Sequence, residues 1–317
     1  MRNSKGPTFE IRVPASTANL GAGFDCFGLA LELYLTVRAT VQPGVGARTV
    51  ARSRGVSGSS KLPSAPHENL ILRAMRHAAE QQNFRLPPVH LAVQNDIPIA
   101  AGLGSSAAAI VAGIALAFAV SGRKLPEQTA LRLAADLEYH TDNVGAALLG
   151  GLVVSFVGDD GNVVAVRKHW PKEIRAIAVT PKMSLETSAS RAALPKTVEH
   201  ADAVHNVQRS ALFLGALDAK RYDLLWDATQ DRLHQSYRQA LIPGLAAALQ
   251  MPRMLGLLGI ALSGAGPSVI ALATDHFAEI GKAMASHFAR NGQAASIRNL
   301  AVAQEGLRVI RKAKAKK

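Results

Sequence analysis

The chain has 317 residues, of which 48% are hydrophobic and 19% are charged, a balance that indicates a folded globular protein rather than a disordered one. Its formal net charge of +13 would suit either an anionic small molecule or nonspecific contact with RNA, and charge alone does not choose between them. The single cysteine, Cys26, excludes an internal disulfide and a cysteine-rich metal site, which suits a reducing cytoplasm.

The first half of the chain mixes strand and helix patterns. Its first residues, MRNSKGPTFEIRVPA, lack the apolar core of a secretory signal. Alternating apolar residues predict strands at 9–15, 29–41 and 89–95. Apolar residues at helical spacing, or in an alanine-rich run, predict helices at 68–82, 105–120 and 126–140. A stretch rich in Gly, Ser, Pro and Arg predicts a surface loop at 48–66, and a hairpin is expected at 150–166.

The second half continues the mixture. Strands are expected at 173–180 and 294–302, two further strands around a glycine turn at 259–274, and helices at 198–219 and 276–291. The irregular order of strands and helices predicts an α+β fold. Because a domain usually holds about 100–200 residues, we expect two domains, 1–165 and 166–317. The basic tail, Leu307–Lys317, is expected to be a solvated, frayed end rather than a nucleic-acid arm.

One stretch without charged residues, IPIAAGLGSSAAAIVAGIALAFAVSG, raises the question of a membrane span. A span needs about 20 consecutive apolar residues. Here Pro98, Gly102 and Gly104 interrupt the first part, together with two serines, so that the uninterrupted run is only Ala107–Val120. A buried core helix explains that run better than a membrane span.

The start of this helix leaves two interpretations open. A strand, a glycine-rich turn and a helix follow one another, and Gly102 and Gly104 would let the backbone approach a ligand closely. Backbone N–H groups and the helix dipole favour a phosphate there, beside the hydroxyls of Ser105 and Ser106. A capped helix without function explains the same residues equally well. The pattern lacks the Gly-Lys-Ser/Thr of a Walker A loop, the second strand of a dinucleotide-binding unit and the G-x-S-x-G of a nucleophile elbow.

Polar residues gather in three other stretches. VPASTANLGAGFDCFGLAL places Asn19 and Asp25 in a glycine-bent loop, and LSGAGPSVIAL forms a second such loop. LEYHTDNVGAALLGG is either an ordinary helix end or a metal and substrate cluster, in which carboxylate and hydroxyl ligands would suit Mg²⁺ rather than zinc. Two arginines, Arg191 and Arg238, could hold a carboxylate in bidentate fashion if they converge.

Together, PASTANLGAGFD, PIAAGLGSSAAA and SGAGPSVIAL resemble, in this order, the three motifs of the GHMP small-molecule kinases, and the resemblance covers nearly the whole chain. Within that family the chain is most similar to the branch that phosphorylates L-homoserine, on PASTANLGAGFDCFGLAL, HTDNVGAALLGGLVV and LHQSYRQALIP. Ala22 and Thr141 stand where proline is common in that branch. The resemblance implies a first domain like domain 2 of ribosomal protein S5 and a ferredoxin-like second domain.

The resemblance also implies a role for each matching residue. Those expected at the ATP are Asn69, Pro98, Ala101, Gly102, Leu103, Gly104, Ser105, Ser106 and Ala107. Ser106 and Glu138 would hold Mg²⁺, with Ser105 as a close rival to Ser106. The residues expected to line the L-homoserine pocket are Asn19, Asp25, His140, Asp142, Arg191, Arg238 and Gly264. Asp25 would meet the ammonium group, and the two arginines would bind the carboxylate.

The implied reaction is ATP-dependent phosphorylation of L-homoserine to O-phospho-L-homoserine, a step of threonine biosynthesis. Phosphoryl transfer depends mostly on positioning and on neutralising charge. Thr187, Asp142 and Asn143 would lie at the reacting hydroxyl, but Asn143 stands where relatives acting on mevalonate and galactose have an aspartate base. An amide is no base at neutral pH, so our hypothesis is that no side chain takes the proton strongly.

Two alternatives remain at this point. Another GHMP kinase, acting on a different small alcohol or amine, would share the same motifs. A basic RNA-binding protein would share the charge, but an aromatic content of 5% and the absence of an aromatic RNA-binding motif disfavour it. We therefore expect a cytoplasmic enzyme that binds neither nucleic acid nor membrane, and the resemblance leaves room for a homodimer.

Overall fold

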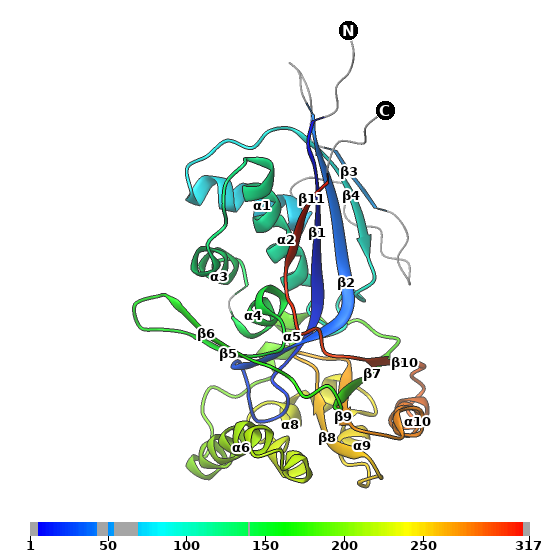
Figure 1. The fold of residues 1–317 in the computed structure, drawn as a ribbon. Coiled ribbons are helices and arrows are strands. Elements are labelled where there is room, and N and C mark those ends of the chain that lie inside the picture. The colour runs from blue at the N-terminus through cyan, green and yellow to red at the C-terminus, as the bar shows by residue number, and fades with distance from the viewer. Residues whose placement is uncertain (1–5, 43–49, 54–68, 139, 313–317) are drawn as a thin grey trace.

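The computed structural model describes residues 6–42, 50–53, 69–138 and 140–312, and it contains two sheets (Figure 1). The first sheet has the strand order β11-β1-β2-β4-β3, and β2 also pairs with β5, which pairs with β6. Its strands are β1 (Thr8–Ala18), β2 (Phe27–Val41), β3 (Val50–Ser53), β4 (Val89–Asn95), β5 (Leu152–Val157), β6 (Val163–Lys168) and β11 (Arg308–Lys312). All its pairs are antiparallel except that of β3 with β4.

The second sheet is antiparallel and has the order β10-β7-β9-β8. Its strands are β7 (Arg175–Pro181), β8 (Leu257–Leu262), β9 (Val269–Ala273) and β10 (Ala295–Leu300). Both sheets are accompanied by helices, so the predicted α+β class is confirmed. The boundary proposed at residue 165 stays a prediction; β6 crosses it, and β11 returns to the first sheet from the end of the chain.

The helices of the first half lie together on one side of the first sheet (Figure 1). They are α1 (Leu70–Gln81), α2 (Ser105–Val120), α3 (Glu127–Ala135) and α4 (Asp142–Leu149). Beneath them, Ile11, Val37 and Val93 pair across three strands and are all buried, as the alternating pattern predicts. Because α2 is apolar on all sides, it is buried on nearly all sides, which is the position of a core helix. Within the described ranges, no helix is long and apolar enough to cross a membrane.

Further helices accompany the second sheet. They are α5 (Thr187–Ala192), α6 (His200–Asp218), α7 (Leu225–Ala228), α8 (Gln235–Arg238), α9 (Leu245–Leu249) and α10 (Phe277–Ala289), with short 3₁₀ turns at Tyr222–Leu224 and Gln239–Leu241. The buried side chains of Met284 and Phe288 on α10 form a core with Ile177 and Val179 of β7. A larger core fills the space under the first sheet and continues into the second half, where it includes Ala178, Phe213 and Ile270. The site forms in the loops between the two sheets.

Three predictions of local structure differ from the structure. The helix expected over 126–140 ends at Ala135, so Glu138 lies in a connection and α4 starts at Asp142. Val50–Ser53, within the loop expected over 48–66, forms β3, and all other residues of that loop lie outside the described residues. The tail expected to be frayed forms β11 as far as Lys312, where its backbone pairs with the edge of β1; the residues after it lie outside the described ranges.

Candidate active site

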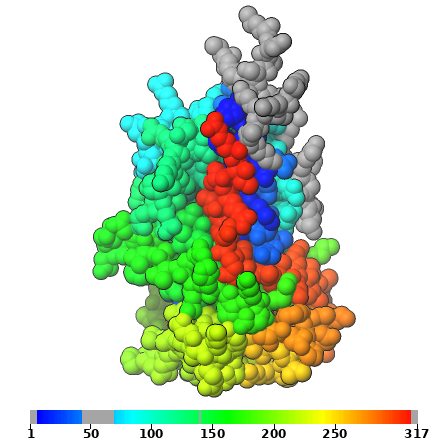
Figure 2. Space-filling model, viewed as in Figure 1, coloured from blue at the N-terminus to red at the C-terminus, as the bar shows by residue number. Residues whose placement is uncertain are grey.

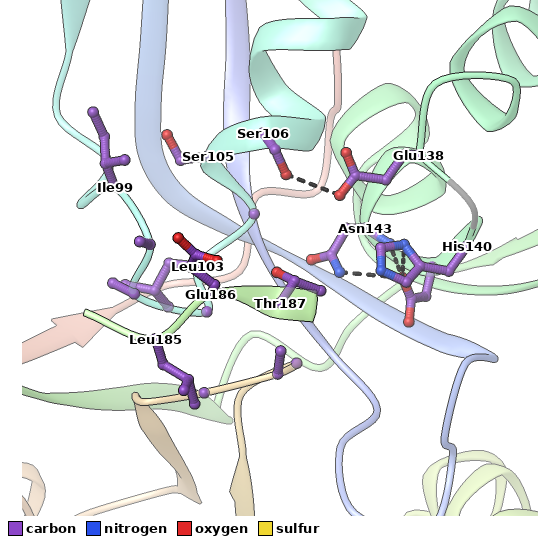
Figure 3. Close-up of a pocket in the computed structure, with 18 of the residues that line it drawn as sticks. Ile99, Leu103, Ser105, Ser106, Glu138, His140, Asn143, Leu185, Glu186 and Thr187 are labelled. Carbon is purple, nitrogen blue, oxygen red and sulfur yellow. Dashed lines mark hydrogen bonds and ion pairs between the residues drawn. The ribbon is translucent and has the colours of Figure 1, made fainter. Parts of the chain in front are cut away.

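Loops from both halves of the chain line a cavity of about 580 Å³ (Figure 3). It lies where the β1–β2 loop, the start of α2, the connection before α4, helix α5 and the β8–β9 loop approach one another. The lining residues predicted from the sequence are Asn19, Asp25, Asn69, Ala101, Gly102, Leu103, Gly104, Ser105, Ser106, Glu138, His140, Asp142, Asn143, Thr187, Arg191, Arg238 and Gly264. Residues up to 245 positions apart are therefore in contact here.

The glycine turn precedes α2 with its backbone in the left-handed region, at φ of 74° for Gly102 and 67° for Gly104. A Cβ on Gly104 would lie 2.0 Å from Ser16 Oγ. Both the left-handed backbone and this lack of space therefore favour glycine at position 104. The carbonyls of Ala101 and Leu103 accept hydrogen bonds from backbone N–H groups elsewhere in the fold. Gly104 offers no side chain to cap the first turn of α2, so the N–H groups of that turn are available to an anion.

A hydroxyl and a carboxylate meet beside this helix start. Ser106 donates a hydrogen bond of 2.8 Å to Oε1 of Glu138, from the connection before α4 (Figure 3). Burial raises the pKa of Glu138, and His140 and the Ser106 hydrogen bond oppose that rise. A cation at this place would keep the carboxylate ionised. Among the residues described, no group of three or more His, Cys, Asp and Glu could hold a metal ion, so a cation here would depend on other oxygen ligands as well.

The start of α4 presents a buried acid and an amide. Asp142 is 1% exposed, and burial raises its pKa to about 6. Its Oδ1 accepts hydrogen bonds from the backbone N–H and the side-chain amide of Asn143, and Oδ1 of Asn143 accepts one of 2.8 Å from Ser16. Nδ1 of His140 lies 4.0 Å from Oδ1 of Asp142. The Asn143 amide is therefore held on both sides.

The other end of the cavity holds an ion pair between an arginine and an aspartate. Arg191 on α5 donates two hydrogen bonds to Asp25, from Nη2 to Oδ1 at 2.7 Å and from Nη1 to Oδ2 at 3.2 Å. Asp25 is held in turn because its backbone N–H donates to Oδ1 of Asn19 at 3.0 Å. Nδ2 of Asn19 donates to the carbonyl of Gly264, which joins the β1–β2 loop to the β8–β9 loop.

Arg238 is the most deeply buried arginine of the site, at 1% exposure. It donates to the carbonyls of Gly264 and Ser190 and to Nδ1 of His234. Burial, together with the neighbouring Arg191, lowers its pKa to about 10. Two cationic side chains therefore converge on one end of the cavity, which is the arrangement that a carboxylate would stabilise.

Comparison with known proteins identifies the family. Two family models match the chain: the one described as "GHMP kinases N terminal domain" matches residues 69–151, and the one described as "GHMP kinases C terminal" matches residues 212–290. The chain belongs to the GHMP kinase family. The predicted GHMP kinase fold is thereby confirmed, since solved structures agree with it as well.

Several relatives of this GHMP kinase carry one name. A protein named homoserine kinase from Desulfitobacterium hafniense is 39% identical over 301 residues, which cover 95% of this chain and 99% of that relative. One of the same name from Solibacter usitatus is 38% identical over 303 residues, covering 96% and 97%. The crystal structure of homoserine kinase from Cytophaga hutchinsonii has a TM-score of 0.84 and 26% identity, covering 96% of this chain and 97% of that one.

Two residues predicted at the ATP site of this GHMP kinase do not line the cavity. Ala107 is fully buried inside α2, and Pro98 lies before the lining segment, which starts at Ile99. The sequence interpretation also missed Phe24, although it lies inside a quoted motif. An apolar group at the cavity was missed as well, because single apolar residues carry no functional signal: Leu70, Ile71, Ile99, Ala109 and Leu185.

Proposed function

We propose that this GHMP kinase transfers the γ-phosphoryl group of ATP to the hydroxyl of L-homoserine, giving ADP and O-phospho-L-homoserine in threonine biosynthesis. One observation carries the proposal: a single cavity joins an uncapped glycine-rich helix start to the pair of arginines and the aspartate that suit a zwitterionic amino acid. The full-length relatives named homoserine kinase support the same substrate.

At the nucleotide end, we assign the phosphates of ATP to the turn from Ala101 to Ser106 and the first turn of α2. Backbone N–H groups and the helix dipole favour phosphate there. Asn69 caps α1 through its side-chain oxygen, which accepts from the backbone N–H groups of Ile71 and Leu72, and it lines the same part of the cavity. The adjoining apolar residues suit the flat, weakly polar face of the adenine base.

At the amino-acid end, we assign the substrate carboxylate to Arg191 and Arg238, and the ammonium group to Asp25 and Asp142. These side chains, with Asn19, His140 and the Gly264 loop, surround a space of suitable polarity. Thr187, the first residue of α5, lines the cavity between the two ends, where the reacting hydroxyl would lie. The site would thus bind both reactants and exclude water from the space between them.

We propose that Mg²⁺ is held by Ser106 and Glu138. Their oxygens lie 2.8 Å apart beside the proposed phosphate site, and a hard cation prefers such ligands together with phosphate oxygens and water. When bound, Mg²⁺ would neutralise charge on the phosphates. No side chain is assigned as a strong base: Asn143 is an amide, and its oxygen already accepts from Ser16. The hydroxyl proton would pass to the phosphate or to solvent.

The test is a coupled assay of ADP release with ATP and L-homoserine, in the presence and absence of Mg²⁺. We expect turnover with L-homoserine and Mg²⁺, and little with mevalonate, galactose or threonine-like alcohols. If one of these other acceptors reacted faster than L-homoserine, that acceptor would be the substrate and the proposal would be wrong. We also propose a cytoplasmic location and allow for a homodimer, which light scattering of the purified protein measures.

A further inference from the structure

His234, which none of the assignments above uses, lies fully buried next to the arginine at the amino-acid end of the cavity. Its Nδ1 is 2.9 Å from Nη1 of Arg238, and its Nε2 is 2.9 Å from the carbonyl oxygen of Gly21. A guanidinium group can only donate and a carbonyl can only accept. The ring must therefore be neutral, with a lone pair on Nδ1 and the proton on Nε2.

The segment that carries His234 is anchored by an aspartate. The carboxylate of Asp231 accepts hydrogen bonds from the backbone N–H groups of Leu233, His234 and Gln235, and one from the side-chain amide of Asn206 on α6. The amide of Asn206 also donates to the carbonyl of Ala22 in the β1–β2 loop. The ring is thus fixed relative to the same loop that carries Asp25.

Burial and the neighbouring guanidinium of Arg238 keep the ring neutral, against the charges of two aspartates. Asp231 comes from its own segment, Arg238 from α8, and Asp25 from the β1–β2 loop, where Asp25 is paired with Arg191 of α5. Burial lowers the pKa of His234, and the two aspartates and the bond to Gly21 oppose that change. Protonation of Nδ1 would place an N–H group against the guanidinium and remove the acceptor that orients it.

An aromatic ring connects this pair to the cavity wall. Phe24 stacks on His234, with ring centroids 5.0 Å apart and planes 19° from parallel. The guanidinium carbon of Arg238 lies 5.6 Å from the Phe24 centroid, within the range of a cation–π contact. Because Phe24 lines the cavity, a turn of the imidazole would also move this wall.

We propose that His234 is a positioning residue: its Nδ1 lone pair holds the Arg238 guanidinium in the orientation that binds the carboxylate of the amino-acid substrate. This inference rests on the proposed function, since it assigns Arg238 to that carboxylate. His234 does not line the cavity, so it acts through Arg238.

Two variants test the two hydrogen bonds of the His234 ring separately. In His234→Asn, the amide oxygen lies near the position of Nδ1 and can still accept from Arg238. In His234→Gln, the amide nitrogen lies near the position of Nε2 and can still donate to Gly21, but the acceptor for Arg238 is lost. We expect His234→Gln to raise the KM for L-homoserine about tenfold, with kcat and the KM for ATP little changed, and His234→Asn to raise it less.

A substrate without the carboxylate gives the control. For 3-amino-1-propanol, which is homoserine lacking that group, His234→Gln should leave the KM at the wild-type value. A double variant with Arg238→Ala should bind homoserine no more weakly than Arg238→Ala alone. The proposal is overturned if His234→Gln leaves the homoserine KM unchanged, or if it raises the KM of ATP and of both acceptors alike, as a general disturbance of the fold would.

The ring can also be observed in the wild-type protein. Nitrogen-15 NMR at neutral pH, with the His234 signals identified by their loss in His234→Gln or His234→Asn, should show Nε2 protonated and Nδ1 unprotonated. A protonated Nδ1 overturns the proposal whichever alcohol the enzyme phosphorylates. By contrast, wild-type enzyme that does not phosphorylate L-homoserine in the coupled assay contradicts the proposed function, so the two failures are distinguishable.

Discussion

Arg191 and Asp25, which are 166 residues apart in the chain, form a bidentate ion pair at the amino-acid end of the cavity. Each side chain has the charge opposite to one end of a zwitterionic amino acid. A bound amino acid could therefore place its carboxylate on Arg191 and its ammonium group on Asp25, in exchange for their contact with each other. Both side chains remain more than one-third exposed, so the pair itself contributes little to the stability of the fold.

The first prediction concerns Arg191→Ala. Loss of a charged hydrogen-bond donor costs about 1.5–3 kcal/mol, which corresponds to an increase of about 10- to 100-fold in the KM for L-homoserine. The KM for ATP should stay the same. Arg221→Ala is the matched control, because Arg221 also pairs with an aspartate, Asp223, but on the exposed surface away from the cavity. An unchanged homoserine KM in Arg191→Ala would show that this arginine does not bind the carboxylate.

The second prediction concerns Gly104→Ala at the start of α2. The left-handed backbone costs an alanine about 1–2 kcal/mol, and its Cβ would also meet Ser16 Oγ at 2.0 Å. We expect a large rise in the KM for ATP together with a lower melting temperature. Gly122 has a similar φ of 70°, but a Cβ there would meet nothing within 4 Å, so Gly122→Ala isolates the backbone strain. If both variants bind ATP equally well, the turn does not hold the phosphates.

The third prediction concerns pH. Burial raises the pKa of Asp142 to about 6, so its carboxyl group is charged at neutral pH and becomes protonated as the pH falls through about 6. A neutral carboxyl attracts the substrate ammonium less, so the KM for L-homoserine should rise over that range while kcat stays level. Asp142→Asn should raise the KM at neutral pH and remove this dependence. A kcat that falls below one pKa, and that loses this dependence in Asp142→Asn with binding intact, would instead identify Asp142 as the proton acceptor.

The fourth prediction concerns the proposed Mg²⁺ ligands. Glu138→Gln keeps the size of the side chain and removes its charge, so the Mg²⁺ concentration required for half-maximal activity should rise at least several-fold. Ser106→Ala should act in the same direction, whereas Ser105→Ala, one residue away, should not. Titration of each variant with Mg²⁺ at saturating ATP measures this. If only Ser105→Ala raised this Mg²⁺ concentration, Ser105 rather than Ser106 would supply the hydroxyl ligand.

Much of the architecture was predictable because apolar periodicity records which side of an element is buried. The strand at 89–95 and the helix at 105–120 have the predicted limits. The strand β11 was missed because arginines and lysines dominate its composition, and its Val309 and Ile310 are exposed at the edge of the sheet. An edge strand can tolerate such residues, since charged side chains reach solvent there.

The site was less predictable in its details. The polar, glycine-rich motifs indicated which residues belong to the site, but the sequence does not show which of these residues are in contact. Neither the contact of Arg191 with Asp25 nor the burial of His234 has a local pattern, because both depend on segments brought together by the two sheets. The end of α3 at Ala135 was also missed: the sequence pattern continues to His140, whereas in the structure Glu138 lies beyond the helix and accepts a hydrogen bond from Ser106.

The carboxy-terminal strand lies along the amino-terminal strand on the surface of the molecule (Figure 2). During synthesis, β1 is therefore made well before its partner β11, which leaves the ribosome only after both sheets' other strands. Until then, the N–H and C=O groups along this edge of β1 lack their final partner. A chain broken off before Arg308 would keep that edge open to pairing with other chains, so β11 also protects β1 from such pairing.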